Sequence, residues 1–479
     1  MILVFLVLLT AGCSGEIETP AAKTASKMED SCTGCHKVAL DENHRLGCTT
    51  CHAGEEKSTS WQQAHEGLVA QPAHPDNAPK YCGSCHEKDI NMVADSAHYT
   101  LRDHVSLVRK AFGAQTSSDS ALLIQPSAFP QNALELTDDL LRRRCLRCHV
   151  YTEGDNFTQV KRATGCGACH LTYSDGQMQS HTFISKPDDS RCLSCHYGNH
   201  VGSDYYGRYE HDYNEEYRTP YRLDSIPVRP FGVEYHELEP DVHQKAGMIC
   251  IDCHSKSQVM GNEKNSRTCK ACHDSEYLQN NLPPGIAKIE KVFTFTSAAT
   301  DTSLALPVLK HAAHFSSDKV SCQACHARWT FNDGETHLMR IDHDDFDDFY
   351  KLSLDGSFEV GTIISSHIDY DGDLLEPVMT DKFTGQELPG IWFKGYSERR
   401  WERVILLRDD KGTITTGRPI LDLSLSWIDS DENVHFDKIQ PIPGIKTVLP
   451  YTPHSIGAAG LYYQERLRLF SGQVEAVIE

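Results

Sequence analysis

The sequence predicts two regions of different fold class. One is a long cysteine-rich segment of short helices and irregular loops, and the other is a C-terminal β-rich, sandwich-like domain. Three observations predict this division. The motif Cys-x-x-Cys-His occurs nine times between Cys32 and His326. Only 39% of the 479 residues are hydrophobic, which is low for so long a chain. After His326 the motif is absent, and apolar residues begin to alternate with polar ones.

The nine motifs use 18 of the 19 cysteines. Zinc ribbons, thioredoxin-like sites and disulfide frameworks all contain paired cysteines, but none needs a histidine directly after every pair. A c-type haem needs both, because two thiols bond its vinyl groups and the following histidine is an axial ligand of the iron. The sequence therefore predicts nine covalently bound haem c groups, attached through Cys32/Cys35/His36, Cys48/Cys51/His52, Cys82/Cys85/His86, Cys145/Cys148/His149, Cys166/Cys169/His170, Cys192/Cys195/His196, Cys250/Cys253/His254, Cys269/Cys272/His273 and Cys322/Cys325/His326.

The density of the motifs predicts what fills the interior of this segment. Between Cys32 and His326 there are about 33 residues per motif, too few to build a separate hydrophobic core around each cofactor. We therefore expect short helices and irregular loops wrapped around a stacked chain of haems, with the porphyrins as the core. Folding should then depend on haem attachment, as the folding of small metal domains depends on their metal.

The second axial ligands are expected among the histidines outside the motifs. The chain has 26 histidines, of which 17 are not in motifs. Iron held by two histidines has a low reduction potential. Candidate distal ligands, chosen because they lie upstream of a motif or between motifs, are His44, His74, His181, His243, His314, His200, His211, His98, His104, His236 and His311. His454, in the tail beyond the last motif, is a further candidate. Methionine is an alternative sixth ligand, from Met92, Met178, Met248, Met260, Met339 or Met379. Which ligand serves which haem stays open.

The N-terminus has the pattern of an export signal. Residues 1–12 form an apolar run too short to span a bilayer, but suited to the core of a signal peptide. Its end, Leu9-Thr-Ala-Gly-Cys13, resembles a bacterial lipobox, which would make Cys13 the lipidated residue. An ordinary secretory signal with an incidental cysteine is the alternative. Residues 13–31 are small and polar and are expected to form a flexible tether.

We expect four further segments. Residues 32–140 carry haems one to three and a helical insert, in which Leu101, Val105, Val108 and Phe112 recur at helical spacing. Residues 141–245 carry haems four to six and a tyrosine-rich stretch, 246–330 carry haems seven to nine, and 331–479 form the haem-free β-rich domain.

In the C-terminal domain, the alternation from Leu421 to Trp427 predicts a half-buried strand, and 404–416 predict a hairpin turning at 409–412. Acidic runs at 342–348 and 369–373 do not fit the EF-hand pattern and favour solvated turns over calcium sites. His454 lies in a Pro-His element that precedes a CxxCH motif in some multihaem cytochromes. Here no cysteine follows, so either a tenth haem has been lost or His454 ligates one of the nine. The haem of motif nine is expected either to dock on this domain as the exit or to take His454 as a ligand.

The formal charge of −21 makes nucleic acid an unsuitable partner. Basic redox partners, metal cations and mineral surfaces are compatible with it, and so is a role in solubility alone.

The motifs, the surplus of histidine, the lipobox and the β-rich appendage resemble the multihaem c-type cytochrome lipoproteins of metal- and metalloid-respiring Gram-negative bacteria. The chain is similar, more weakly, to cytochromes encoded with selenite or tellurite reduction clusters. The resemblance implies an outer-membrane lipoprotein, facing the periplasm or the exterior, that passes electrons to other cytochromes or to a porin–cytochrome complex and has no catalytic residues of its own. The alternative is a multihaem reductase of nitrite or of sulfur or selenium oxyanions, which needs one haem with an open coordination position. Such enzymes often carry a CxxCK motif, and none occurs here.

Overall fold

The structure is a computed structural model, and it describes residues 32–58, 60–117, 120–154, 157–198, 202–210, 231–233, 235–263, 267–298, 300–310, 319–330, 332–343, 357–368, 376–395, 398–400, 404–459, 463, 465–468 and 470. The chain divides into two compact units. The first comprises residues 1–38 and 47–69, and the second comprises 39–46 and 70–479. Among the described residues, no helix combines the length and apolar character that crossing a bilayer requires.

The first unit contains three short helices, α1 (Cys32–Cys35), α2 (Cys48–His52) and α3 (Trp61–Ala64). Two of them begin at the first cysteine of a motif. The described side chains of this unit are all at least partly exposed to solvent. Its described part therefore has no hydrophobic core of its own.

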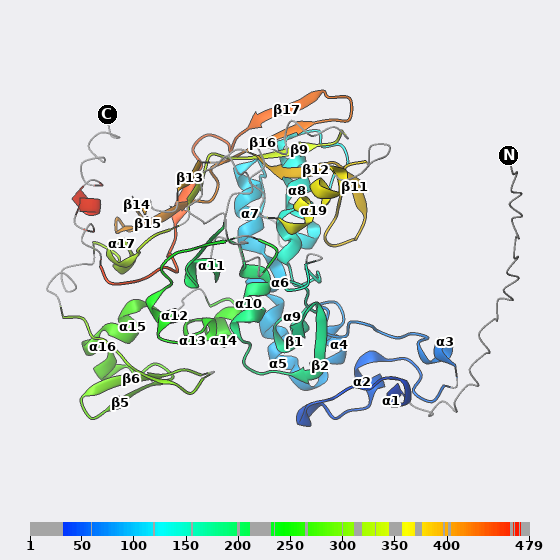
Figure 1. The fold of residues 1–479 in the computed structure, drawn as a ribbon, viewed down its shortest axis with the longest axis horizontal. Coiled ribbons are helices and arrows are strands. Elements are labelled where there is room, and N and C mark those ends of the chain that lie inside the picture. Colours follow the sequence, from blue (N-terminus) through cyan, green and yellow to red (C-terminus); the bar gives the residue numbers. More distant parts are fainter. Residues whose placement is uncertain are drawn as a thin grey trace, which may run out of the picture. The chain divides into compact units, whose positions relative to one another are not determined.

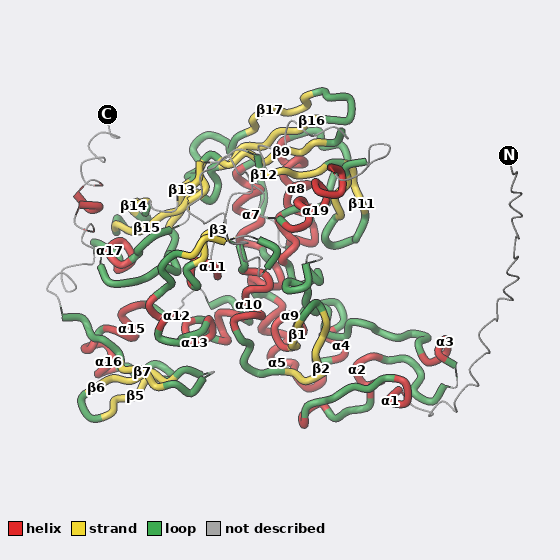
Figure 2. Tube along the Cα trace, viewed as in Figure 1, coloured by secondary structure: helices red, strands yellow, loops and turns green. Residues whose placement is uncertain are grey.

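Helices of the second unit are also short (Figure 1, Figure 2), and the longest have 11 or 12 residues. In chain order they are η1 (Glu42–His44), α4 (Ala78–Tyr81), α5 (Gly83–Ala94), α6 (Ala97–Thr100), α7 (Arg102–Ala111), η2 (Ala121–Leu123), α8 (Ala133–Arg143), η3 (Cys145–Cys148), α9 (Cys166–His170), α10 (Asp189–His196), α11 (Gly202–Tyr205), α12 (Val242–Lys245), α13 (Cys250–Cys253), α14 (Lys256–Val259), α15 (Cys269–His273), α16 (Ser275–Asn280), α17 (Cys322–His326) and α19 (Phe358–Ile368).

Strands form small sheets that are mainly antiparallel. Those before residue 331 are β1 (Leu171–Ser174), β2 (Gln177–Phe183), β3 (Arg208–Glu210), β4 (Tyr235–Glu237), β5 (Ile286–Ile289), β6 (Val292–Thr296) and β7 (Ser303–Ala305). Those after it are β8 (Asn332–Gly334), β9 (Thr336–Ile341), β10 (Val378–Thr380), β11 (Glu387–Pro389), β12 (Ile391–Lys394), β13 (Glu398–Arg400), β14 (Ile405–Arg408), β15 (Ile414–Pro419), β16 (Leu423–Ile428), β17 (Val434–Ile439) and β18 (Val448–Pro450).

The predicted amphipathic helix in the first long gap is confirmed as α7. Val105, Val108 and Ala111 are buried on one face, as the helical spacing of apolar residues requires. Leu101 has φ 46°, in the left-handed region, and it separates α7 from α6. His98 therefore lies on α6, before this break, and His104 lies on α7, after it.

Two β elements are also confirmed. Strands β14 and β15 form the predicted antiparallel hairpin, and its turn is held by Asp409, whose Oδ1 accepts hydrogen bonds from the backbone of Lys411 and Thr413 at 2.9 and 2.8 Å. The strand predicted at 421–427 is β16, which pairs with β17 and, in parallel, with β9. Its predicted half-burial is wrong, because Ser424 and Ser426 of the expected exposed face are also buried, and Ser426 Oγ accepts from the Lys438 amide at 2.9 Å.

The main hydrophobic core differs from the sandwich that we expected for 331–479. Its four-stranded sheet, in the order β12-β9-β16-β17, packs against helices α7, α8 and α19 instead of a second sheet (Figure 1). Trp392, Leu425 and Trp427 of the sheet share this core with Leu136 and Leu140 of α8. The expected boundary at residue 330 therefore does not separate two cores, because the helical insert of 32–140 covers one face of the C-terminal sheet.

Candidate functional site

All nine motifs lie in the described part of the chain, on or next to short helices. Seven of these helices begin at the first cysteine of their motif and have four or five residues, namely α1, α2, η3, α9, α13, α15 and α17. Such a turn places the second cysteine and the histidine on adjoining faces. None of the 18 cysteines that the structure describes forms a disulfide bond. Each of these motifs thus presents two thiols and one imidazole over about one helical turn.

Motif three departs from this arrangement. Cys82 immediately precedes α5, while Cys85 and His86 lie within this helix, and the backbone of His86 is non-helical, with φ −115° and ψ 29°. Cys85 is exposed, and its Sγ lies 3.9 Å from the Oγ of Ser84. Residues 84–88, the first part of α5, all face solvent. Cys85 shares its exposure with three other motif cysteines, Cys35, Cys145 and Cys269. Haem attachment through Cys85 stays a prediction.

Within the part of the chain that the structure describes, five motif histidines lie close to a histidine from outside the motifs. The distances between ring centroids are 6.1 Å for His36–His65, 6.2 Å for His44–His86, 6.4 Å for His98–His196, 6.0 Å for His243–His273 and 6.2 Å for His254–His454. Each of these histidine pairs combines one motif histidine with one non-motif histidine.

The spacing of the histidine pairs is the one that two axial ligands of a single iron require. A metal–nitrogen bond is about 2 Å, and the centre of an imidazole lies about 1 Å behind its ligating nitrogen, so two opposed ligands have centroids about 6 Å apart. The angles between the ring planes range from 20° to 90°. Such a range is compatible with axial ligation, because each ring can rotate about its metal–nitrogen bond.

Hydrogen bonds at Nδ1 select the nitrogen that is left for a metal. In His65, Nδ1 lies 2.6 Å from the carbonyl oxygen of Trp61. In His98, Nδ1 lies 2.9 Å from the carbonyl oxygen of Val259, and in His273 it lies 2.7 Å from that of Pro307. Since a carbonyl can only accept, Nδ1 carries the proton and Nε2 keeps its lone pair.

The same arrangement occurs at three motif histidines outside the five pairs. In His52, Nδ1 bonds to the backbone carbonyl of Val69 at 2.9 Å. In His170 it bonds to the carbonyl of Ile184 at 2.7 Å, and in His326 to the carbonyl of Gly457 at 2.9 Å. In each of them, Nε2 is therefore again the nitrogen with the lone pair.

His149 of motif four is different. It is buried, its Nε2 lies 3.0 Å from the carbonyl of Tyr99, and its ring stacks on Tyr151 at 4.9 Å. Burial lowers the pKa of His149 to about 4, which keeps its imidazole neutral. In the structure, the nitrogen that would bind iron is engaged by a backbone carbonyl.

Neutral imidazoles are the form that binds metals, and the structure favours this form in two of the pairs. Burial and the neighbouring imidazoles of His98, His454 and His254 lower the pKa of His196 to about 4. Burial and His254 lower the pKa of His454 to about 4 as well. The His98–His196 and His254–His454 pairs are thus close enough to influence each other.

The structure places some of the candidate distal ligands in histidine pairs and others elsewhere. His44, His98, His243 and His454 each lie in a histidine pair. The structure places His104 on the exposed face of α7, His181 on β2, and His74 against Tyr151, with 5.1 Å between ring centroids. His236 is buried and stacks on Tyr209. His200, His211, His311 and His314 lie outside the described residues, as do Cys13 and the acidic residues 344–348 and 369–373.

Three further expectations need correction. His454 lies close to His254 of motif seven, and not to motif nine, which was one of the two options given for the ninth haem; the tail meets His326 through the carbonyl of Gly457 instead. Met339 and Met379 lie in the hydrophobic core, where Met379 Sδ accepts from the Trp392 amide, so neither faces a motif. Asp342 of the acidic run is buried against Arg340 and Trp427, so it is not a solvated turn.

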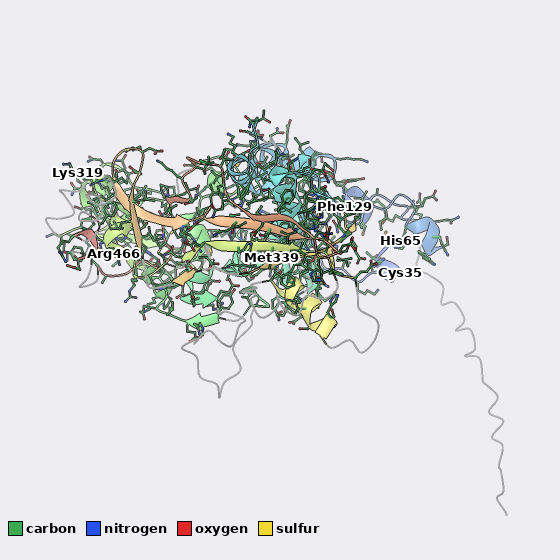
Figure 3. The ribbon with its side chains drawn as sticks, turned by 90° about the horizontal axis from the view of Figure 1, so that it is seen from above. Cys35, His65, Phe129, Lys319, Met339 and Arg466 are labelled. Carbon is green, nitrogen blue, oxygen red and sulfur yellow. The ribbon has the colours of Figure 1, made fainter. Side chains whose placement is uncertain are left out.

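His65 is the one paired histidine missing from the candidates chosen from the sequence. It lies in the first unit with Cys35, from the same motif as its partner His36 (Figure 3). The position of His65 between the second and third motifs is a signal that could have identified it.

Among the described residues, no group of three or more His, Cys, Asp and Glu side chains could hold a metal ion. Each histidine pair supplies only two protein ligands, so any iron that it binds must take its remaining ligands from another group. No protein-family model, curated protein or solved structure matches this chain.

Proposed function

We propose that this protein is a nonahaem c-type cytochrome that relays electrons through closely spaced, low-potential haems in extracytoplasmic respiration of metals or metalloids. The observation that carries the proposal is the set of five histidine pairs. Each pair joins the histidine of a CxxCH motif to a second imidazole at the spacing of two axial ligands. A bound haem supplies the equatorial nitrogens and a one-electron iron couple.

The residues of the chain have three tasks in this proposal. The cysteines would attach the cofactor, the paired histidines would ligate its iron, and the acceptors at Nδ1 orient the imidazole rings. Two nitrogen ligands without a thioether favour a low potential. The first unit, in which the described part has no buried side chain, supports the expectation that a cofactor supplies the missing core.

Contacts between motifs support a relay. Cys148 of motif four lies 3.5 Å from the carbonyl of Cys195 in motif six, and the amide of Cys250 in motif seven donates to Asp189, on the helix of motif six, at 2.8 Å. Motifs four, six and seven thus form one connected series.

The series continues towards motif nine. The Cys272 thiol of motif eight is close enough to raise the pKa of Cys253 in motif seven, after burial. The thiols of Cys269 and Cys322 are hydrogen-bonded to each other and join motifs eight and nine. Residues of motifs seven, eight and nine are thus also connected, which supports a relay along the chain.

A haem count combined with electron paramagnetic resonance of the oxidised protein tests the proposal. Nine covalent haems, all low-spin ferric, are expected. Failure to attach haem would refute the cytochrome assignment. A stable high-spin signal that shifts on adding nitrite, sulfite or selenite would instead favour the oxyanion reductase, and motif four would then be the first place to look for the open iron.

A further inference from the structure

Two of the five non-motif histidines bond through Nδ1 to a carboxylate, whereas two others, His65 and His98, bond to a backbone carbonyl. In the His44–His86 pair, Nδ1 of His44 lies 2.8 Å from both carboxylate oxygens of Asp41. Asp41 Oδ1 also accepts from the amides of Asn43 and His44 at 3.0 and 3.1 Å, and its Oδ2 accepts from the Phe183 amide on β2 at 3.0 Å. The carboxylate is therefore fixed from two segments of the chain.

The His243–His273 pair has the same arrangement of a carboxylate behind the non-motif imidazole. In the His243–His273 pair, Nδ1 of His243 lies 2.8 Å from Asp241 Oδ1, which also accepts from the His243 amide at 2.8 Å. Asp241 Oδ2 accepts from the amide of Ile456 at 2.7 Å. Asp241 is only 2% exposed. A buried carboxylate with its lone pairs engaged is a strong acceptor for the imidazole proton.

The remaining pairs provide the contrast. His65 and His98 bond through Nδ1 to the backbone carbonyls of Trp61 and Val259, at 2.6 and 2.9 Å. These acceptors are neutral. The pairs of His65 and His98 thus differ from those of His44 and His243 in the charge of the group behind the distal imidazole.

This charge has a chemical consequence for a ligated metal. A carboxylate that accepts the Nδ1 proton makes the imidazole a stronger donor through Nε2, and a stronger donor stabilises ferric over ferrous iron. On the basis of the proposed function, we infer that Asp41 and Asp241 are positioning residues that lower the reduction potentials of the haems on motifs three and eight below those of the haems on motifs one and six.

The other charged groups near these two sites either also lower the reduction potential of the haem or are neutralised by a group of opposite charge. Asp89 Oδ2 lies 3.7 Å from Nδ1 of His86, the motif ligand of the first site, while Lys256 neutralises Asp89 through a contact of 2.7 Å. At the second site, His273 bonds to the neutral carbonyl of Pro307. Asp41 and Asp241 are therefore the principal charged groups on the distal rings.

Asp41→Asn and Asp241→Asn test the inference in the full, haem-loaded protein. Asparagine keeps an oxygen for Nδ1 and for the helix cap but removes the charge. The readouts are the haem count, the low-spin resonance signals and a spectroelectrochemical titration. Each variant should retain nine low-spin haems, while one midpoint potential rises and the other eight stay in place. Asp204→Asn is the control, because it removes a buried carboxylate bonded to Tyr451 and should leave the titration unchanged.

An unchanged titration curve in Asp41→Asn, with all nine haems low-spin, would overturn the inference. If one variant loses haem because its amide nitrogen cannot accept from Phe183 or from Ile456, the other variant decides. Absence of haem from the unmutated protein would refute the proposed function instead, so the two failures are distinguishable.

Discussion

At the scale of single residues, the hydrogen-bond partner of each imidazole determines which of its two nitrogens can bind a metal. A histidine has two chemically similar nitrogens, and which one carries the proton depends on its hydrogen-bond partner. In His65, His98 and His273, a backbone carbonyl binds the Nδ1 proton and leaves Nε2 as the donor atom. The backbone thereby prepares the imidazole for a metal before any metal binds.

Replacing His98 should open one coordination position. His98→Ala removes the imidazole that lies 6.4 Å from His196, so one of nine haems should change from low-spin to high-spin, without loss of covalent haem. Electron paramagnetic resonance and the Soret band measure this change. His104→Ala is the matched control, because His104 lies on the exposed face of α7 and in none of the five pairs. A high-spin signal in the control, or none in His98→Ala, would contradict the assignment.

Replacing His454 separates motif seven from motif nine. Since His454 lies 6.2 Å from His254, His454→Ala should give one high-spin haem on motif seven. The same substitution in a variant that lacks the motif-nine haem, made by changing Cys322 and Cys325 to Ser, should still give that high-spin signal. Its disappearance in the combined variant would place His454 on motif nine.

At the scale of elements, a buried polar network joins α8 to the sheet. Asp139 Oδ2 binds Arg143 of α8 at 2.8 Å, Arg340 of β9 at 3.2 Å and the indole of Trp392 in β12 at 2.9 Å. Arg143 also donates to three backbone carbonyls at 388–390. Asp139, Arg143 and Arg340 are completely buried. The network fixes how the helix lies on the sheet, which apolar contacts alone would determine less specifically.

Asp139→Asn should strongly destabilise this core. It leaves the guanidinium of Arg143 without a compensating charge, and breaking a buried ion pair in this way costs about 3–5 kcal/mol. Urea unfolding, followed by tryptophan fluorescence, measures the loss. Asp410→Asn, which breaks an exposed pair with Lys446, should leave the unfolding midpoint unchanged. A similar effect of both substitutions would argue against the network.

At the scale of the whole molecule, the two units differ in how they are stabilised. The second unit contains a core of apolar side chains on α7, α8, α19 and the four-stranded sheet. The described part of the first unit has three short helices and no buried side chain. Helices of four or five residues are unstable in water without tertiary packing. The first unit should therefore depend on what its motifs bind.

Protein that lacks the first two haems should lose order in the first unit alone. Changing Cys32, Cys35, Cys48 and Cys51 to Ser prevents covalent attachment at those motifs. Limited proteolysis should then cut within residues 32–38 or 47–69 much faster than in the unmodified protein, while the core of the second unit stays protected. Equal protection of the first unit in both proteins would show that it folds without the cofactor.

The sequence by itself determined the features that depend on local pattern. Nine CxxCH motifs predict covalent haem, which stays a prediction. The spacing of Val105 and Val108 predicts α7, and alternation with a polar turn predicts the β14–β15 hairpin. These two structural predictions are confirmed because helical and strand periodicities and turn preferences act over a few residues.

Only the tertiary structure decided which histidines meet and which thiols are covered. His98 lies close to His196, His254 lies close to His454 near the end of the chain, and Cys85 is left exposed. The same is true of the helices that cover the C-terminal sheet, where a second sheet was expected. Side chains brought together from distant segments depend on how the intervening chain is packed, and no local pattern encodes that packing. The sequence therefore determined the candidate ligands, and the fold determined their pairing.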